Sequence, residues 1–153
     1  MSHYQLRIKQ FLKTDIDTIW DFASSPANLK EITPDYMLFN ITSKNLPEKM
    51  YPGMIIAYEV SPILNIKMNW LTEITQVKDK SFFIDEQRMG PYNMWHHQHI
   101  FEEQNDGVLM TDIVTYIPPF GIVGDIANTF FIKKQLKNIF DYRYKVMDEK
   151  FNK

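Results

Sequence analysis

The sequence contains no cysteine and only five glycines among its 153 residues. The missing cysteine excludes a disulfide framework, a cysteine-ligated zinc or iron–sulfur site, and thiol catalysis. The glycines are isolated, so they do not form a glycine-rich dinucleotide-binding loop. No apolar run approaches the roughly 18 residues that a membrane span needs. Charged residues interrupt the apolar stretch at the N-terminus, which is not typical of a signal peptide.

The chain also lacks a large net charge. It has 17 basic and 19 acidic residues, a formal net charge of -2, and no basic cluster that would favour nucleic-acid binding. With 44% hydrophobic and 24% charged residues, its composition is typical of one globular domain, which we place at residues 1–153. We therefore expect a cytoplasmic protein that binds a small molecule, without nucleic acid or integral membrane association. The oligomeric state stays open.

Hydrophobic periodicity predicts how the chain begins. Alternating Tyr4, Leu6 and Ile8 predict a first strand. Thr14, with a carboxylate three residues later, predicts a capping box at the start of a short helix. A second short helix is predicted over residues 27–32, before Pro34 ends it.

Six further strands and one long helix are predicted after these elements. The strands are expected at 36–44, 53–61, 66–77, 81–89, 94–103 and 108–117. Short turn segments separate them, which favours an antiparallel meander. An apolar stripe from Ile126 to Met147 predicts a C-terminal helix of roughly 25 residues, about 38 Å long. The fold class is therefore α+β: a seven-stranded curved antiparallel sheet around a long C-terminal helix, with a cavity expected between them.

Several segments resemble those of a known superfamily. They are Trp20-Asp21-Phe22-Ala23-Ser24, Ile32-Thr33-Pro34, Trp70-Leu71-Thr72-Glu73-Ile74, Asp85-Glu86-Gln87, Gly90-Pro91-Tyr92, Trp95-His96-His97-Gln98-His99-Ile100-Phe101 and Asp112-Ile113-Val114-Thr115-Tyr116. Together with the order of elements, they resemble the helix-grip proteins of the START-related, pollen-allergen-like superfamily, also labelled SRPBCC. The segments are most similar to a bacterial ligand-binding subfamily, related to polyketide cyclases and coenzyme-Q-binding proteins. The resemblance implies a hydrophobic ligand but assigns no reaction.

Three of the four histidines, His96, His97 and His99, lie in one predicted strand. Alternate residues of a strand share a face, so His97 and His99 point the same way and His96 points the other way. A four-residue hairpin loop at residues 90–93 would place Glu86 opposite His97. A turn at Asp106-Gly107 would place Phe101 opposite Asp112, His99 opposite Val114 and His97 opposite Tyr116. A loop longer by two residues shifts these last partners but keeps the same face.

This face is the expected ligand-binding surface, because a small-molecule site combines apolar walls with a few polar groups. Phe120, at a rigid Pro-Pro turn, and Phe130, on the long helix, are expected at the rim and depth of the cavity. The expected ligand-binding residues are Glu86, Arg88, Trp95, His97, His99, Phe101, Asp112, Val114, Tyr116, Phe120 and Phe130. Arg143 lies close to the apolar helix stripe, so we expect it to pair with a carboxylate or to reach past the helix edge. The orientation of Trp70 and Glu73 stays open.

Three other interpretations compete with simple binding. Glu86 and His97 are candidate catalytic residues, as an acid–base pair of a cofactor-independent cyclase, lyase or hydrolase. His97, His99 and Glu86 would also supply two imidazoles and a carboxylate to a metal. Polar sets of this kind arise by chance on strand pairs, so the sequence favours no metal and no cofactor. An interaction module, with nine methionines offering an adaptable surface, is the third. It would require a large exposed apolar patch and no cavity.

Overall fold

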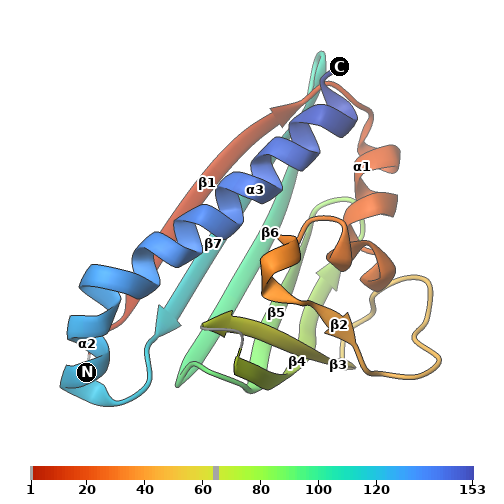
Figure 1. Cartoon of the computed structure of the whole chain (residues 1–153). Helices are drawn as coiled ribbons and strands as arrows, with labels where there is room; N and C mark the ends of the chain where they lie inside the picture. Colours follow the sequence, from red (N-terminus) through yellow and green to blue (C-terminus); the bar gives the residue numbers. More distant parts are fainter. Residues whose placement is uncertain (1, 64–65) are drawn as a thin grey trace.

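The computed structural model describes residues 2–63 and 66–153, and this part of the chain forms a seven-stranded antiparallel sheet (Figure 1). The strand order across the sheet is β1-β7-β6-β5-β4-β3-β2. The strands are β1 (Tyr4–Leu12), β2 (Asn40–Ile41), β3 (Met54–Ile63), β4 (Ile66–Lys78), β5 (Phe82–Met89), β6 (Met94–Gln104) and β7 (Gly107–Ile117). Consecutive strands from β2 to β7 are neighbours, so the expected meander is confirmed, and β7 then pairs with β1.

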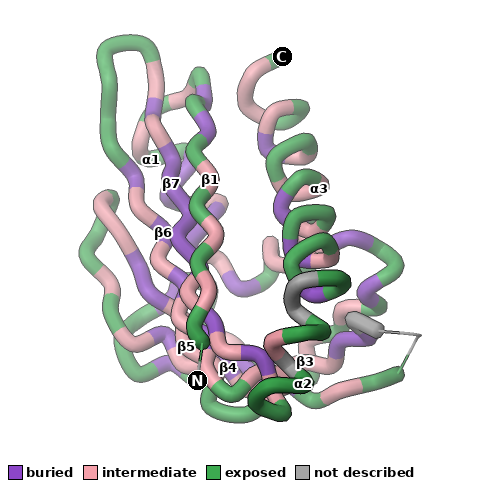
Figure 2. The backbone as a smooth tube through the Cα atoms, turned by 90° about the vertical axis from the view of Figure 1, so that its left-hand side faces the viewer, coloured by how far each residue is buried: buried purple, intermediate pink, exposed green. Residues whose placement is uncertain are grey.

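A C-terminal helical segment crosses the inner face of this sheet, and three short helices follow β1 (Figure 1). The helices are α1 (Ile16–Ala23), η1 (Pro26–Lys30), η2 (Asp35–Met37), α2 (Gly121–Ala127), η3 (Asn128–Ile132) and α3 (Lys133–Phe151). Figure 2 shows the buried positions of α3 on the side that faces the sheet. Helix α3 also contacts β1, where the Gln10 side chain donates to the Tyr144 carbonyl at 2.9 Å. The predicted architecture, a curved sheet around a long terminal helix, is confirmed.

Alternating burial along β6 fixes which side of the sheet faces the core. Trp95, His97, His99 and Phe101 are buried, while the residues between them are partly exposed. This is the period of two that a strand with one buried face requires. The core has two apolar clusters: one around Trp20, Phe83 and Phe101, the other around Trp70, Trp95 and Phe140.

Two details near the N-terminus differ from the predictions. Helix α1 is capped by Asp15, whose carboxylate accepts a 2.8 Å hydrogen bond from the Thr18 N–H, and not by Thr14. The predicted strand 36–44 is reduced to Asn40–Ile41, because η2 occupies its start and Leu38 has a left-handed backbone conformation with φ 47°. A chain that turns in this way cannot extend as a strand.

The C-terminal helical segment is interrupted by a π-helical turn, η3. A π turn is wider than an α turn, so it changes the direction in which the preceding side chains point. Leu136, Phe140 and Met147 of α3 are buried, whereas Ile122 and Ile126 of α2 are exposed. In the described part of the chain, no helix is long and apolar enough to cross a membrane.

Candidate functional site

A cavity of about 160 Å³ lies between the sheet and α3. A single water needs roughly 10–15 Å³ on this scale, so the space holds on the order of ten waters. Aromatic rings form much of the wall, from Tyr58, Trp70, Tyr92 and Trp95 of the sheet side and Phe140 of α3. The rings contact one another: Trp70 meets Trp95 edge to face, with centroids 5.3 Å apart. The wall is therefore mainly apolar.

Polar side chains gather at one part of this wall. Strand pairing brings them together: β5 places Asp85 opposite His97, and β7 places Asp112 opposite His99. Arg143 reaches the same group from α3. Asp85, His97, His99 and Arg143 line the cavity, whereas Asp112 does not. We call these five residues the polar cluster.

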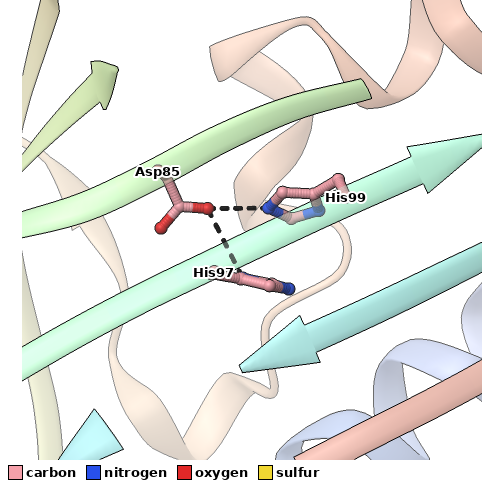
Figure 3. A group of neighbouring side chains, drawn as sticks. All are labelled: Asp85, His97 and His99. Atoms are coloured by element: carbon pink, nitrogen blue, oxygen red, sulfur yellow. Dashed lines mark hydrogen bonds and ion pairs between the residues drawn. The ribbon is translucent and has the colours of Figure 1, made fainter. Parts of the chain in front are cut away.

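Each carboxylate of the polar cluster contacts both imidazoles, and Figure 3 shows the contacts of Asp85. Asp85 Oδ2 lies 2.7 Å from His99 Nε2 and 3.4 Å from His97 Nδ1. Asp112 Oδ1 lies 2.9 Å from His97 Nε2 and 3.0 Å from His99 Nδ1. Arg143 Nη2 lies 3.3 Å from His99 Nδ1 and 3.7 Å from Asp112 Oδ1. The pairing expected for Arg143 is therefore present.

Burial makes these contacts electrostatically strong. Burial alone would raise the pKa of Asp112, but the Arg143 guanidinium and hydrogen bonds to His97 and His99 hold that pKa well below its ordinary value. Burial also opposes ionisation of Asp85, yet the two imidazoles lower its pKa. The pKa values of the two histidines shift in opposite directions. Burial lowers the pKa of His97, whereas hydrogen bonds to Asp112 and Asp85 overcome burial and raise the pKa of His99.

Apolar packing holds the imidazoles in place between the two core clusters. The His97 and His99 ring centroids are 3.7 Å apart. Phe83 stacks on His99 with centroids 4.0 Å apart, and Phe140 contacts the His97 ring edge to face at 5.5 Å. These side chains are positioned by strands and a helix, which hold a site more rigidly than loops do.

The predicted register between β5 and β6 is wrong by one residue. Asp85 lies opposite His97, and Glu86 lies opposite His96 on the outer face, where the two side chains are 2.7 Å apart. Gln87 explains the shift: its side-chain amide bonds to the N–H and C=O of Tyr92, at 3.1 and 2.6 Å. These bonds replace strand pairing beyond Glu86, so the connection is wider than four residues. The predicted Glu86–His97 acid–base pair is not formed.

Arg88 also lies on the outer face, where its guanidinium pairs with Glu73. Its exposed position follows from the same one-residue shift, because residues 86 and 88 share a strand face. Trp70, whose orientation the sequence left open, lines the cavity. Neither Glu86 nor Arg88 lines the cavity formed by the described residues.

The predicted partners across β6 and β7 are displaced by two residues. His99 lies opposite Asp112, His97 opposite Val114 and Trp95 opposite Tyr116. The turn is formed by residues 105 and 106, since Gln104 pairs with Gly107. A shift of two keeps the same face, so the predicted inward direction of these side chains is confirmed.

The remaining predicted residues divide into three groups. Trp95, His97 and His99 line the cavity. Phe101, Asp112, Val114 and Tyr116 are buried but do not line it. Phe120, in the turn before α2, and Phe130, in η3, are 82% and 78% exposed, so neither has the predicted cavity position.

Comparisons with known proteins give matches in structure. No family model matches the sequence, and no curated protein matches it. The TTHA0849 protein of Thermus thermophilus is 14% identical over 95% of each chain, with a TM-score of 0.71. Major latex-like protein 151 of Panax ginseng is 13% identical over 97% of each chain, with a TM-score of 0.70. Ara h 8.0201 is 11% identical over 95% of this chain and 98% of its own, with a TM-score of 0.62. At these identities the likeness shows the fold, which is the helix-grip fold.

Proposed function

We propose that the protein binds a hydrophobic or amphipathic small molecule, such as a lipid, quinone, polyketide or isoprenoid, in the cavity between the sheet and α3. The supporting observation is an apolar cavity of about 160 Å³ with charged side chains confined to one part of its wall. Small-molecule sites combine apolar walls with a few polar groups that fix the ligand's orientation. The apolar body of the ligand lies against the aromatic rings, and its polar end meets the polar cluster.

The location of the polar groups determines the orientation of the ligand. Asp85, His97, His99 and Arg143 are held by the contacts described above, so they are ordered before a ligand arrives. Preorganised groups reduce the entropy that binding costs. The polar end of the ligand is expected to carry oxygen atoms that accept hydrogen bonds from Arg143 or an imidazole N–H.

The cavity also favours ligand binding over an interaction module, which would have an apolar patch and no cavity. Helices α2 and η3 do expose apolar side chains, but the cavity, which an interaction module would lack, still favours ligand binding. We further propose membership of the bacterial ligand-binding subfamily, on the segments that resemble it.

Native mass spectrometry of gently purified protein tests the proposal directly, by searching for a co-purified small molecule. A second test uses 8-anilino-1-naphthalenesulfonate, which has an apolar body and an anionic end. Ile139 lines the cavity from α3, so Ile139→Phe fills part of the space. The added ring occupies space that the dye needs, so this substitution should weaken dye binding roughly tenfold, a loss of about 1.4 kcal/mol of binding free energy.

Lys134→Phe provides the matched control, because Lys134 is an exposed residue of the same helix. It adds the same ring without entering the cavity, and dye binding should stay unchanged. Equal dye affinities for the wild type and Ile139→Phe, with both folded, would contradict binding in the cavity.

A further inference from the structure

The polar cluster has four close contacts between imidazole nitrogens and carboxylate oxygens. Both nitrogens of His97 and both nitrogens of His99 face a carboxylate, at 2.7 to 3.4 Å. A neutral imidazole carries one N–H, and its other nitrogen has a lone pair. Two neutral rings therefore supply two N–H groups to four contacts. In the other two contacts a lone pair faces a negative oxygen, which is repulsive unless a proton or a metal ion lies between them.

His99 Nε2 makes the shortest contact, a 2.7 Å hydrogen bond to Asp85 Oδ2, and Arg143 Nη2, which can only donate, lies 3.3 Å from His99 Nδ1. These two contacts place an N–H on His99 Nε2. Asp112 Oδ1 lies at 2.9 and 3.0 Å from one nitrogen of each ring, ordinary lengths for N–H donors. An ion that displaces the Nε2 proton of His99 would let both rings donate to Asp112, with the lone pairs of His97 Nδ1 and His99 Nε2 directed toward Asp85 Oδ2. Three electron-pair donors then converge on one place, two imidazole nitrogens and a carboxylate oxygen.

We propose that His97 Nδ1, His99 Nε2 and an Asp85 carboxylate oxygen bind a divalent transition-metal ion, such as Zn²⁺ or Fe²⁺. One donor atom from each of the three residues lies within 4.8 Å of the donor atoms of the other two. Donors about 2.0–2.2 Å from a common ion lie roughly 3–3.5 Å apart. The separations of Asp85 Oδ2 from the two nitrogens, 2.7 and 3.4 Å, require little movement to reach this range.

Asp112 fits the role of a supporting residue in such a site. A histidine that binds a metal usually donates its other N–H to a carboxylate, which fixes the tautomer and orients the ring. Here Asp112 Oδ1 lies 2.9 Å from His97 Nε2 and 3.0 Å from His99 Nδ1, so it is placed to accept from both rings once an ion binds their other nitrogens. Arg143, whose Nη2 lies 3.7 Å from this oxygen, balances its charge. From the sequence, no metal was expected, because such polar sets arise by chance on strand pairs, and the carboxylate of the set was Glu86. The register instead supplies Asp85.

The position of the site predicts what the ion would contact. Asp85, His97 and His99 all line the cavity, so coordination positions not used by the protein face the ligand space. Two imidazoles and a carboxylate leave such positions in catalytic rather than structural sites. This step rests on the proposed function: the ion would receive an oxygen-bearing end of the ligand, such as a carboxylate or enolate. Metal binding itself does not depend on the ligand.

The test uses metal ions alone, without any organic ligand. Chelator-treated, folded protein is titrated with Zn²⁺ by calorimetry and with Co²⁺ by visible absorption, and X-ray absorption of the Co²⁺ protein identifies the ligands. We expect stoichiometric binding, a Co²⁺ spectrum of low coordination number, and two imidazoles on the ion. A folded wild type without stoichiometric binding of either ion would overturn the proposal.

Variants then locate the ion. His97→Gln, His99→Gln and Asp85→Asn should each weaken Zn²⁺ binding more than about 100-fold, and Asp112→Asn about 10–100-fold. His96→Gln is the matched control, because His96 lies on the same strand but faces outward. Its affinity should equal that of the wild type. Unchanged binding in folded His97→Gln and His99→Gln would refute this site.

If those variants fail to fold, the X-ray absorption of the wild type still decides, since an ion without two imidazole ligands overturns the assignment. The result is separable from the proposed function. Loss of dye binding in Ile139→Phe concerns the cavity alone, whereas the titration with metal alone concerns the polar cluster alone.

Discussion

One ring nitrogen of His97 and one of His99 lie against the same atom, Asp112 Oδ1, at 2.9 and 3.0 Å. Their rings are also in contact with each other, with centroids 3.7 Å apart. The same oxygen of Asp112 lies 3.7 Å from Arg143 Nη2. Asp112 therefore joins β6, β7 and α3 through one buried group.

Asp112→Asn removes this charge and is expected to cost about 3–5 kcal/mol of unfolding free energy, because Arg143 loses a buried partner. The side chains of Arg143 and Asp112 are only 11% and 9% exposed, so water does not replace the lost interaction. Chemical denaturation of the variant measures the loss. The double variant Asp112→Asn/Arg143→Met should recover part of it, and strictly additive losses would contradict the coupling.

Asp85 and Glu86 are neighbours on β5, and replacing each carboxylate by its amide should reduce the unfolding free energy by different amounts. Asp85→Asn alters a buried contact with both imidazoles and should cost about 3 kcal/mol. Glu86→Gln alters a partly exposed contact with His96 and should cost less than about 1 kcal/mol. Denaturant midpoints compare the two variants. A larger loss for Glu86→Gln would mean that the register is shifted back by one residue.

Two phenylalanines of the C-terminal helical segment offer a matched comparison of burial. Phe140→Ala should cost about 3–5 kcal/mol, because Phe140 is buried against His97 and the second apolar cluster. Phe130→Ala should change stability by no more than about 0.5 kcal/mol, since its side chain is exposed. It should also leave dye binding unchanged. Thermal or chemical denaturation and a dye titration test both statements.

Tyr92 makes stability depend on pH in alkaline solution. Burial raises the pKa of Tyr92 above its ordinary value of 10.0, and the neighbouring Tyr116 raises it further. Above pH 10 the unfolded chain loses this proton while the native protein keeps it, so stability falls as pH rises. Below pH 10 both states keep it and this contribution is constant. Tyr92→Phe should therefore lose less stability than the wild type between pH 9 and 11.

Guanidinium denaturation of both proteins at the two pH values measures this difference, and ionisation common to both cancels in the comparison. An equal decline in the wild type and Tyr92→Phe would show that Tyr92 titrates normally in the native protein.

Periodicity predicted the elements because it reflects which face of each strand or helix is buried. The inward direction of Trp95, His97 and His99 followed from alternation alone, and it did not change when the β6–β7 register shifted by two residues. Arg143 was identifiable because a charged residue beside an apolar helix stripe requires a partner.

The polar cluster's second carboxylate was not predictable in the same way. Whether Asp85 or Glu86 faces inward depends on the side-chain bonds between Gln87 and Tyr92, which widen the connection between β5 and β6. Local patterns do not encode a side chain that replaces backbone pairing. The exposure of Phe130 depends likewise on a π turn, which has no signal in hydrophobic periodicity.

Asp112 is set back from the cavity that His97 and His99 line. A ligand in the cavity would contact the two imidazoles but not Asp112, the carboxylate that orients them. Wall residues such as Tyr58 and Trp70 would contact the ligand directly, whereas Asp112 would act on it only through the two imidazoles. The residues that would contact a ligand are therefore different from the carboxylate that orients the imidazoles.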